Sequence, residues 1–297
     1  MANNFLKKIE AQINSSIILK DEAMMAPYLI DWRGNFRGNA KAILMPTDTQ
    51  MVSTIMQIAD TENQTIVPQG GNTGLVGGGI PDQTGESVIL SLKKMNSIIE
   101  FSPENRTIIA QSGCILQQIH ELVEKQNLCL PLTLAAKGSC TIGGNLATNA
   151  GGLNVLRYGS MREQCLGLEV VLADGSIINQ LEPLRKDNTG YDLKNLFIGS
   201  EGTLGIITAS CLKLVSKPKV KSTSIAVTEK FEHSLKLLEM LQNYSGDQVD
   251  SFEIMPKTLL DIVYKQFPDI SQPIKPYSGF ILLMEISSSK SDNLEDN

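Results

Sequence analysis

The chain has 297 residues, 20% of them charged, and a formal net charge of −6 at pH 7. This acidity argues against nucleic-acid binding, which requires a basic face. No window offers the eighteen or more uncharged apolar residues of a membrane helix, so any membrane contact is expected to be peripheral. Residues 1–10 lack the apolar core of a signal peptide and are not Arg-rich, so a cytoplasmic location is expected. The five cysteines form no Cys-x-x-Cys pair, so neither a disulfide framework nor a metal site is predicted.

The first two thirds of the chain alternate between helical and extended patterns. A Thr47-Asp-Thr-Gln50 capping box predicts a helix start, and Asp174-Gly175 predicts a hairpin turn. Many strands without regular strand–helix alternation indicate an α+β fold with an antiparallel share. Helices are expected at 1–30, after 47 and at 115–126, and strands at 42–45, 65–68, 88–92, 95–101, 107–111, 166–172, 176–181 and 205–215.

A boundary is expected near Ser216-Lys-Pro-Lys219, after which a fresh α+β unit begins. Its two long strands make a thin sheet, and Asn293-Leu-Glu-Asp resembles the start of a helix. The unit is expected to contain strands at 223–227 and 279–286, helices at 231–244 and 256–267, and a short extended piece at 252–255.

Two glycine-rich loops, 70–79 and 138–152, are the most informative feature. Glycine lets the backbone approach a ligand closely, and successive amides form concave anion sites. Neither loop contains Arg, which favours a small diphosphate cofactor over a polyanion. The G-x-G-x-x-G fingerprint between a strand and a helix is absent, as is the Gly-Lys-Ser/Thr end of a Walker loop.

Six sequence blocks in a fixed order carry a family resemblance. They closely resemble the FAD-binding, PCMH-type domain of the D-2-hydroxyacid dehydrogenases, which lie within the vanillyl-alcohol-oxidase-type flavoproteins and include D-lactate dehydrogenase, D-2-hydroxyglutarate dehydrogenase and the glycolate oxidase D subunit. The likeness runs from Asp31 to Val215 and continues more weakly through 252–256. The blocks are 67–79, 136–152, 156–159, 168–175, 184–193 and 197–208.

The resemblance implies two α/β subdomains over 31–217 with extended FAD between them, a helical segment at 1–30 before them and an incomplete substrate (cap) domain at 218–297. By the resemblance, 70–73 and 143–145 wrap the pyrophosphate, and 201–206 support the adenine and flavin. The implied cofactor-binding residues are Pro68, Gly70, Gly71, Asn72, Thr73, Gly74, Leu75, Pro131, Gly138, Ser139, Cys140, Ile142, Gly143, Gly144, Asn145, Thr148, Asn149, Gly151, Gly152, Glu201, Gly202, Gly205 and Ile206.

Many relatives carry a flavin-linking His in the first loop. Residues 69–79 here contain neither His nor Cys, so non-covalent FAD is expected, although Cys140 lies in the second loop. Structural roles are favoured for His120, His233 and Glu253, and a loop-ordering role for Arg157-Tyr158. Residues 189–192 are expected to form a turn beside the flavin.

The family's His-rich metal motif and its Glu-His-Gly-Ile-Gly segment do not occur in this sequence. The catalytic residues are therefore expected outside it, and this chain is expected to be the FAD-binding part. The implied reaction is oxidation of a D-2-hydroxy acid by hydride transfer to flavin N5, with a quinone, an electron-transfer flavoprotein or a cytochrome as electron acceptor. The alternatives left open are an FAD-binding subunit that needs a separate chain and a non-catalytic flavin-binding protein.

Overall fold

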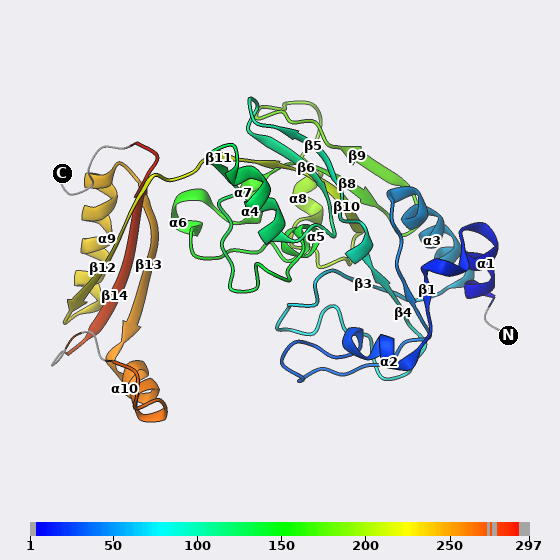
Figure 1. Cartoon of the computed structure of the whole chain (residues 1–297), viewed down its shortest axis with the longest axis horizontal. Coiled ribbons are helices and arrows are strands. Elements are labelled where there is room, and N and C mark those ends of the chain that lie inside the picture. The colour runs from blue at the N-terminus through cyan, green and yellow to red at the C-terminus, as the bar shows by residue number, and fades with distance from the viewer. Residues whose placement is uncertain (1–3, 272–273, 275–277, 291–297) are drawn as a thin grey trace. The chain divides into compact units, whose positions relative to one another are not determined.

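The computed structural model describes residues 4–271, 274 and 278–290. The chain divides into two compact units, coloured by position in Figure 1. Unit 1 comprises Met1–Ala150 and Ser160–Val215, and unit 2 comprises Gly151–Gly159 and Ser216–Asn297. The short segment 151–159 therefore belongs to unit 2, although the chain on both sides of it belongs to unit 1.

Unit 1 holds a four-stranded sheet in the order β1-β2-β4-β3, in which β1 is antiparallel and the other strands are parallel. Helices α1 and α3 pack together beside it, burying Val52, Ile55 and Ile58 of α3. The members are β1 (Ile18–Leu19), β2 (Ile43–Leu44), β3 (Ile66–Gln69), β4 (Val88–Ser91), α1 (Phe5–Gln12) and α3 (Thr49–Glu62).

The predicted capping box of α3 is wrong by one residue. The N-cap is Asp48, whose carboxylate accepts a hydrogen bond from the Met51 amide at 2.8 Å. Aspartate is as good an N-cap as serine and better than threonine, so the neighbouring carboxylate takes the position expected for Thr47.

A second, five-stranded sheet of unit 1 is antiparallel throughout, in the order β5-β6-β10-β8-β9. The predicted hairpin is confirmed, with Gly175 at φ +83° in the turn between β8 and β9. The strands are β5 (Ile98–Ser102), β6 (Thr107–Gln111), β8 (Cys165–Val171), β9 (Ile177–Gln180) and β10 (Ile206–Lys213).

The largest apolar cluster of unit 1 joins this sheet to helices α4 (Leu116–Glu124) and α5 (Ile142–Ala147). Leu116 and Ile119 recur at helical spacing and are fully buried. The remaining short elements are η1 (Ser15–Ile17), α2 (Glu22–Met25), η2 (Ala26–Tyr28), η3 (Leu92–Lys94), β7 (Leu128–Cys129), α7 (Met161–Gln164), α8 (Lys194–Phe197) and β11 (Val215–Ser216).

Unit 2 is a three-stranded antiparallel sheet, β12-β14-β13, with helices α9 and α10. The short extended piece expected at 252–255 is a full strand, β13, because it pairs along β14 from Val249 to Pro256. Helix α6 (Val155–Tyr158) packs against β13. The other elements are β12 (Val220–Thr228), α9 (Phe231–Ser245), β13 (Val249–Pro256), α10 (Lys257–Gln266) and β14 (Phe280–Ser288).

The mixed helices and sheets confirm the predicted α+β class. Asn293-Leu-Glu-Asp lies outside the described residues. Among the residues that are described, no helix has the length and apolar character needed to cross a bilayer.

Candidate functional site

Unit 1 contains a cavity of about 740 Å³ that is lined by both glycine-rich loops. The first loop follows β3 directly, and the second runs into α5. A third segment, from Glu201 into the start of β10, completes the lining. Segments far apart in the sequence thus converge on one space, as the two-loop pattern predicts for a single elongated ligand.

The two loops approach each other so closely that side chains are excluded. A Cβ on Gly71 would lie 2.2 Å from the Ser139 carbonyl oxygen, and one on Gly70 would lie 2.5 Å from Thr141 Oγ1. By contrast, a Cβ on Gly74 would meet nothing within 4 Å. The first two glycines therefore permit backbone packing, whereas Gly74 borders open space.

The structure brings most of the predicted cofactor residues to this cavity. Those that line it are Pro68, Gly70, Gly71, Asn72, Thr73, Gly74, Leu75, Ser139, Cys140, Gly143, Gly144, Asn145, Thr148, Glu201, Gly202, Gly205 and Ile206.

The other six predicted residues do not line the cavity. Ile142 is fully buried in the apolar core, and Pro131 precedes the core residue Leu132. A Cβ on Gly138 would meet Gln117, and Asn149 Oδ1 accepts from Ser160 Oγ and from the Arg162 amide. Gly151 and Gly152 belong to unit 2.

The lining also includes residues outside the predicted set, among them Asp31, Ser112 and Thr141. Ser112 Oγ donates to the Ile207 carbonyl at 2.6 Å, and its own carbonyl accepts from the Gly143 amide at 2.8 Å. Ser112 thereby ties β10 to the second loop. Because it sits beyond β6, far from either glycine run, only the tertiary structure identifies it.

Asp31 is 3% exposed, and its carboxylate accepts from the Phe36 amide at 2.6 Å and the Arg33 amide at 3.1 Å. These bonds close a turn, so this buried carboxylate has a structural task.

Burial raises the pKa of the Cys140 thiol, and the amide of Asn145, 3.6 Å from Sγ, opposes that shift. The thiol is 2% exposed and predominantly protonated near neutral pH. A protonated, buried thiol is a poor nucleophile, which makes Cys140 a poor candidate for a flavin linkage.

Neither histidine lines the cavity. His120 Nε2 lies 3.1 Å from the Leu130 carbonyl, and burial lowers the pKa of its imidazole. His233 lies in α9 of unit 2. Within the described part of the chain, no group of three or more His, Cys, Asp or Glu side chains is placed to hold a metal ion.

The turn expected beside the flavin does not line the glycine-loop cavity. Residues 184–192 line a different cavity of about 650 Å³, together with Cys165 and Lys213, and share no residue with the glycine-loop cavity. A position of this turn beside the flavin therefore stays a prediction. Tyr191 is 90% exposed.

The glycine-loop cavity suits a diphosphate-containing flavin. Thr141 Oγ1 is buried at the cavity without a hydrogen-bond partner in the described structure, and such a group normally has a partner. Backbone, hydroxyl and amide groups dominate the polar lining, and Leu75, Ala136 and Ile206 offer apolar surface to a flat ring system.

Comparison with known proteins agrees with this geometry. A family model described as an FAD binding domain matches residues 40–180. The chain is 42% identical over 272 residues to the mitochondrial D-2-hydroxyglutarate dehydrogenase of Bos taurus, covering 92% of this chain and 49% of the relative. The chain spans about half the length of the curated relatives it matches.

The expectation of a cytoplasmic location is overturned by these relatives, because several of them are named as mitochondrial proteins. The expectation rested on the composition of residues 1–10. An organelle address is read by a receptor and can be removed, so the composition of a folded domain does not report its compartment.

Two solved structures share the fold. Alkyldihydroxyacetonephosphate synthase aligns with a TM-score of 0.77 at 19% identity, covering 97% of this chain and 56% of that one. p-Cresol methylhydroxylase aligns with a TM-score of 0.72 at 20% identity, covering 96% and 60%. Residues 40–180 therefore match an FAD binding domain, and the chain is a homologue of D-2-hydroxyglutarate dehydrogenases over about half of their length.

Proposed function

We propose that this chain is the FAD-binding part of a dehydrogenase that oxidises a D-2-hydroxy acid of the D-2-hydroxyglutarate type to the 2-oxo acid. The observation that carries the proposal is the convergence of both glycine loops on one cavity in a chain 42% identical to a protein named for that activity. When bound, FAD supplies the two-electron acceptor for such an oxidation.

The chain's own residues bind and orient the cofactor in this proposal. Amides of the 70–73 loop hold the diphosphate, and the Thr141 hydroxyl gains a ligand acceptor in place of its missing partner. Pro68 and Gly202, which approach each other closely, brace the cavity wall. FAD is held without a covalent bond, because the cavity lining offers no His and a buried Cys140.

The proton on the substrate hydroxyl needs a base with a suitable pKa. His120 Nε2 lies 3.1 Å from the Leu130 carbonyl, outside the cavity lining, and no lining residue is a histidine. The base is therefore proposed to come from residues other than those of the glycine-loop cavity. A flavin-binding protein without turnover is the less favoured alternative, because the matched relatives are named dehydrogenases.

The test begins with the absorption spectrum of the purified chain after incubation with FAD and gel filtration. Visible flavin bands are expected to remain with the protein and to leave it on denaturation. Colour that stays on the unfolded chain would contradict non-covalent binding, and a colourless folded chain would contradict the whole proposal.

The second step is anaerobic addition of D-2-hydroxyglutarate, D-lactate or L-2-hydroxyglutarate. It is applied to the FAD-loaded chain and to a fusion of this chain with the half of the bovine relative that it does not match. We expect the fusion to be bleached by the D-hydroxyglutarate and the chain alone to stay yellow. A folded, yellow fusion that ignores every D-hydroxy acid would overturn the substrate class, and bleaching of the chain alone would place the base within it.

A further inference from the structure

The segment 151–159 leaves unit 1 and returns to it at residues that are hydrogen-bonded to each other. It is called the excursion below. The chain leaves unit 1 after Ala150, which lines the glycine-loop cavity, and returns at Ser160. Ser160 Oγ donates to Asn149 Oδ1 at 2.8 Å, and the Met161 amide donates to the Ala150 carbonyl at 2.9 Å. The two ends of the excursion are thus fastened to each other beside the cavity wall.

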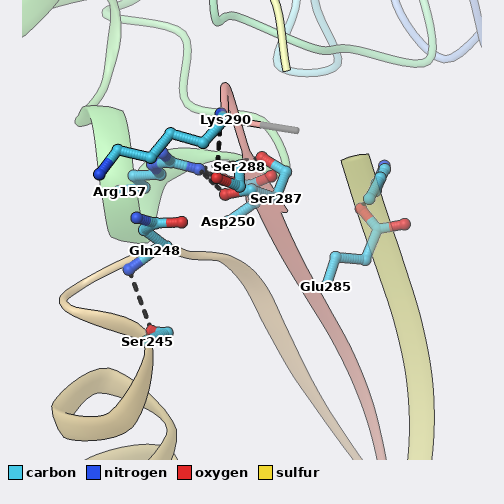
Figure 2. A network of polar contacts seen from close by, with 9 residues as sticks. Arg157, Ser245, Gln248, Asp250, Glu285, Ser287, Ser288 and Lys290 are labelled. Carbon is cyan, nitrogen blue, oxygen red and sulfur yellow. Dashed lines mark hydrogen bonds and ion pairs between the residues drawn. The ribbon is translucent and has the colours of Figure 1, made fainter. Parts of the chain in front are cut away.

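The tip of the excursion is fastened within unit 2 by Arg157 of α6 (Figure 2). Its Nη1 lies 2.8 Å from Asp250 Oδ1 on β13, 2.7 Å from the Ser287 carbonyl and 2.9 Å from Ser287 Oγ on β14. The guanidinium also lies over the Tyr158 ring, 4.9 Å from its centroid. One side chain therefore joins α6 to two strands of the unit 2 sheet.

Burial distinguishes this ion pair from the Lys221–Glu285 pair of the same sheet. The Arg157 and Asp250 side chains are 17% and 6% exposed, whereas Lys221, paired with Glu285, is 54% exposed. An exposed pair contributes little. A buried pair carries a desolvation cost that offsets its attraction, and its best attested use is to fix one arrangement among several. The geometry of Arg157 fits that use.

We propose that Arg157 is a positioning residue that couples the wall of the glycine-loop cavity to β13 and β14. When bound FAD restricts the motion of residues 145–150, the hydrogen bonds between the two ends of the excursion restrict the motion of 151–159 as well. Through its contacts with Asp250 and Ser287, Arg157 extends this restriction of motion to β13 and β14. The inference rests on FAD binding by unit 1, which the proposed function also uses, but it does not require turnover.

The test is hydrogen exchange of the full chain, followed by mass spectrometry, with and without FAD. In the unaltered chain, FAD is expected to slow exchange about fivefold or more at 155–158 and in β13 and β14, the lower range of typical coupling between sites. Arg157→Lys keeps the charge but loses the planar fork, and Ser287→Ala removes one acceptor. Both variants are expected to reduce the FAD-dependent slowing in β13 and β14. Lys221→Gln is the matched control and is expected to keep it.

Flavin absorbance of each sample reports whether FAD is bound. A chain that binds no FAD would overturn the proposed function. Bound FAD with no response in β13 and β14, or a full response in Arg157→Lys, would overturn the coupling alone. A purely structural residue would raise exchange equally with and without FAD, and that result would also contradict the positioning role.

Discussion

Unit 1 and unit 2 are each stabilised internally by a different kind of contact. Unit 1 contains three apolar clusters, in which large side chains such as Ile55, Leu116 and Ile119 are fully buried. In the described part of unit 2, few apolar side chains are buried, and the buried polar residues are at least as numerous as the buried apolar ones. The buried residues of unit 2 are Val249, Ile281, Leu282 and Met284, with Ser234, Asp250, Ser251, Ser287 and Ser288.

This difference shows where each unit is vulnerable. Burial of apolar surface is non-directional and spread over many residues, so unit 1 tolerates polar substitutions away from its core. The polar contacts around Arg157 are directional, and loss of one partner leaves another buried group unsatisfied. A single polar substitution at Arg157 or its partners should therefore lower the stability of unit 2 strongly and leave the stability of unit 1 unchanged.

The largest expected effect comes from Asp250→Ala. It leaves the Arg157 guanidinium without its carboxylate at a site where the pair is mostly buried. Removing one partner of a buried pair costs about 3–5 kcal/mol. Hydrogen exchange resolved by peptide should show that loss in β13 and β14 and leave the protection of β6 and β10 in unit 1 unchanged.

Lys221→Gln is again the matched control, because it breaks an ion pair of the same sheet whose lysine is half-exposed. A change of about 0.2–1 kcal/mol is expected there. Equal losses in the two variants would remove the contrast between buried and exposed pairs. A loss shared by unit 1 would show that the two units unfold together.

The second prediction separates packing from ligand contact within unit 1. Gly71→Ala places a Cβ 2.2 Å from the Ser139 carbonyl, so the backbone must shift, at a cost of about 1–3 kcal/mol. Gly74→Ala adds a Cβ in open space and should change the free energy of unfolding by less than about 0.5 kcal/mol. Both should weaken FAD binding, measured by fluorescence titration, because both residues line the cavity.

Gly74→Ala is the more informative variant of the two, since it tests the ligand without disturbing the fold. Urea unfolding without FAD gives the stability of each variant. If Gly74→Ala binds FAD as tightly as the unaltered chain, the cofactor does not approach that part of the loop.

The local elements of this structure, meaning its turns and helices, can be predicted from the sequence. The hairpin at Asp174-Gly175 and the helix at Leu116–Glu124 follow from turn chemistry and helical spacing. The two glycine loops predict a ligand site because glycine tolerates close backbone approach. Errors at this level are small, such as the shift of the N-cap from Thr47 to Asp48.

The rest depends on contacts between residues far apart in the chain. Ser112 reaches Ile207 across 95 positions, and Arg157 reaches Ser287 across 130. A lone serine or arginine has no periodicity or spacing that announces such a partner. The sequence does not predict the separate cavity lined by 184–192 for the same reason, since its other walls include residues of β8, β9 and β10.

The smallest expected effect also belongs to unit 1, which holds all five cysteines. Burial raises the pKa of the Cys165 thiol from 9.0 to about 12. Above pH 9 the unfolded thiol loses its proton while the folded one keeps it, so the unfolded state binds fewer protons and stability falls as pH rises. The stabilisation is complete below pH 9 and disappears towards the folded pKa, by about 1 kcal/mol between pH 9 and 10.

Urea unfolding of the chain and of Cys165→Ala at pH 8, 9 and 10 isolates this thiol, because the other titrating groups are common to both. We expect the two curves of stability against pH to converge as pH rises, with the alanine variant less steep. Cys129→Ala, at a half-buried position, is the matched control. Parallel curves for the chain and Cys165→Ala would mean that water reaches Sγ. The apolar cluster around Cys165 would then be packed more loosely than the 4% exposure of this residue indicates.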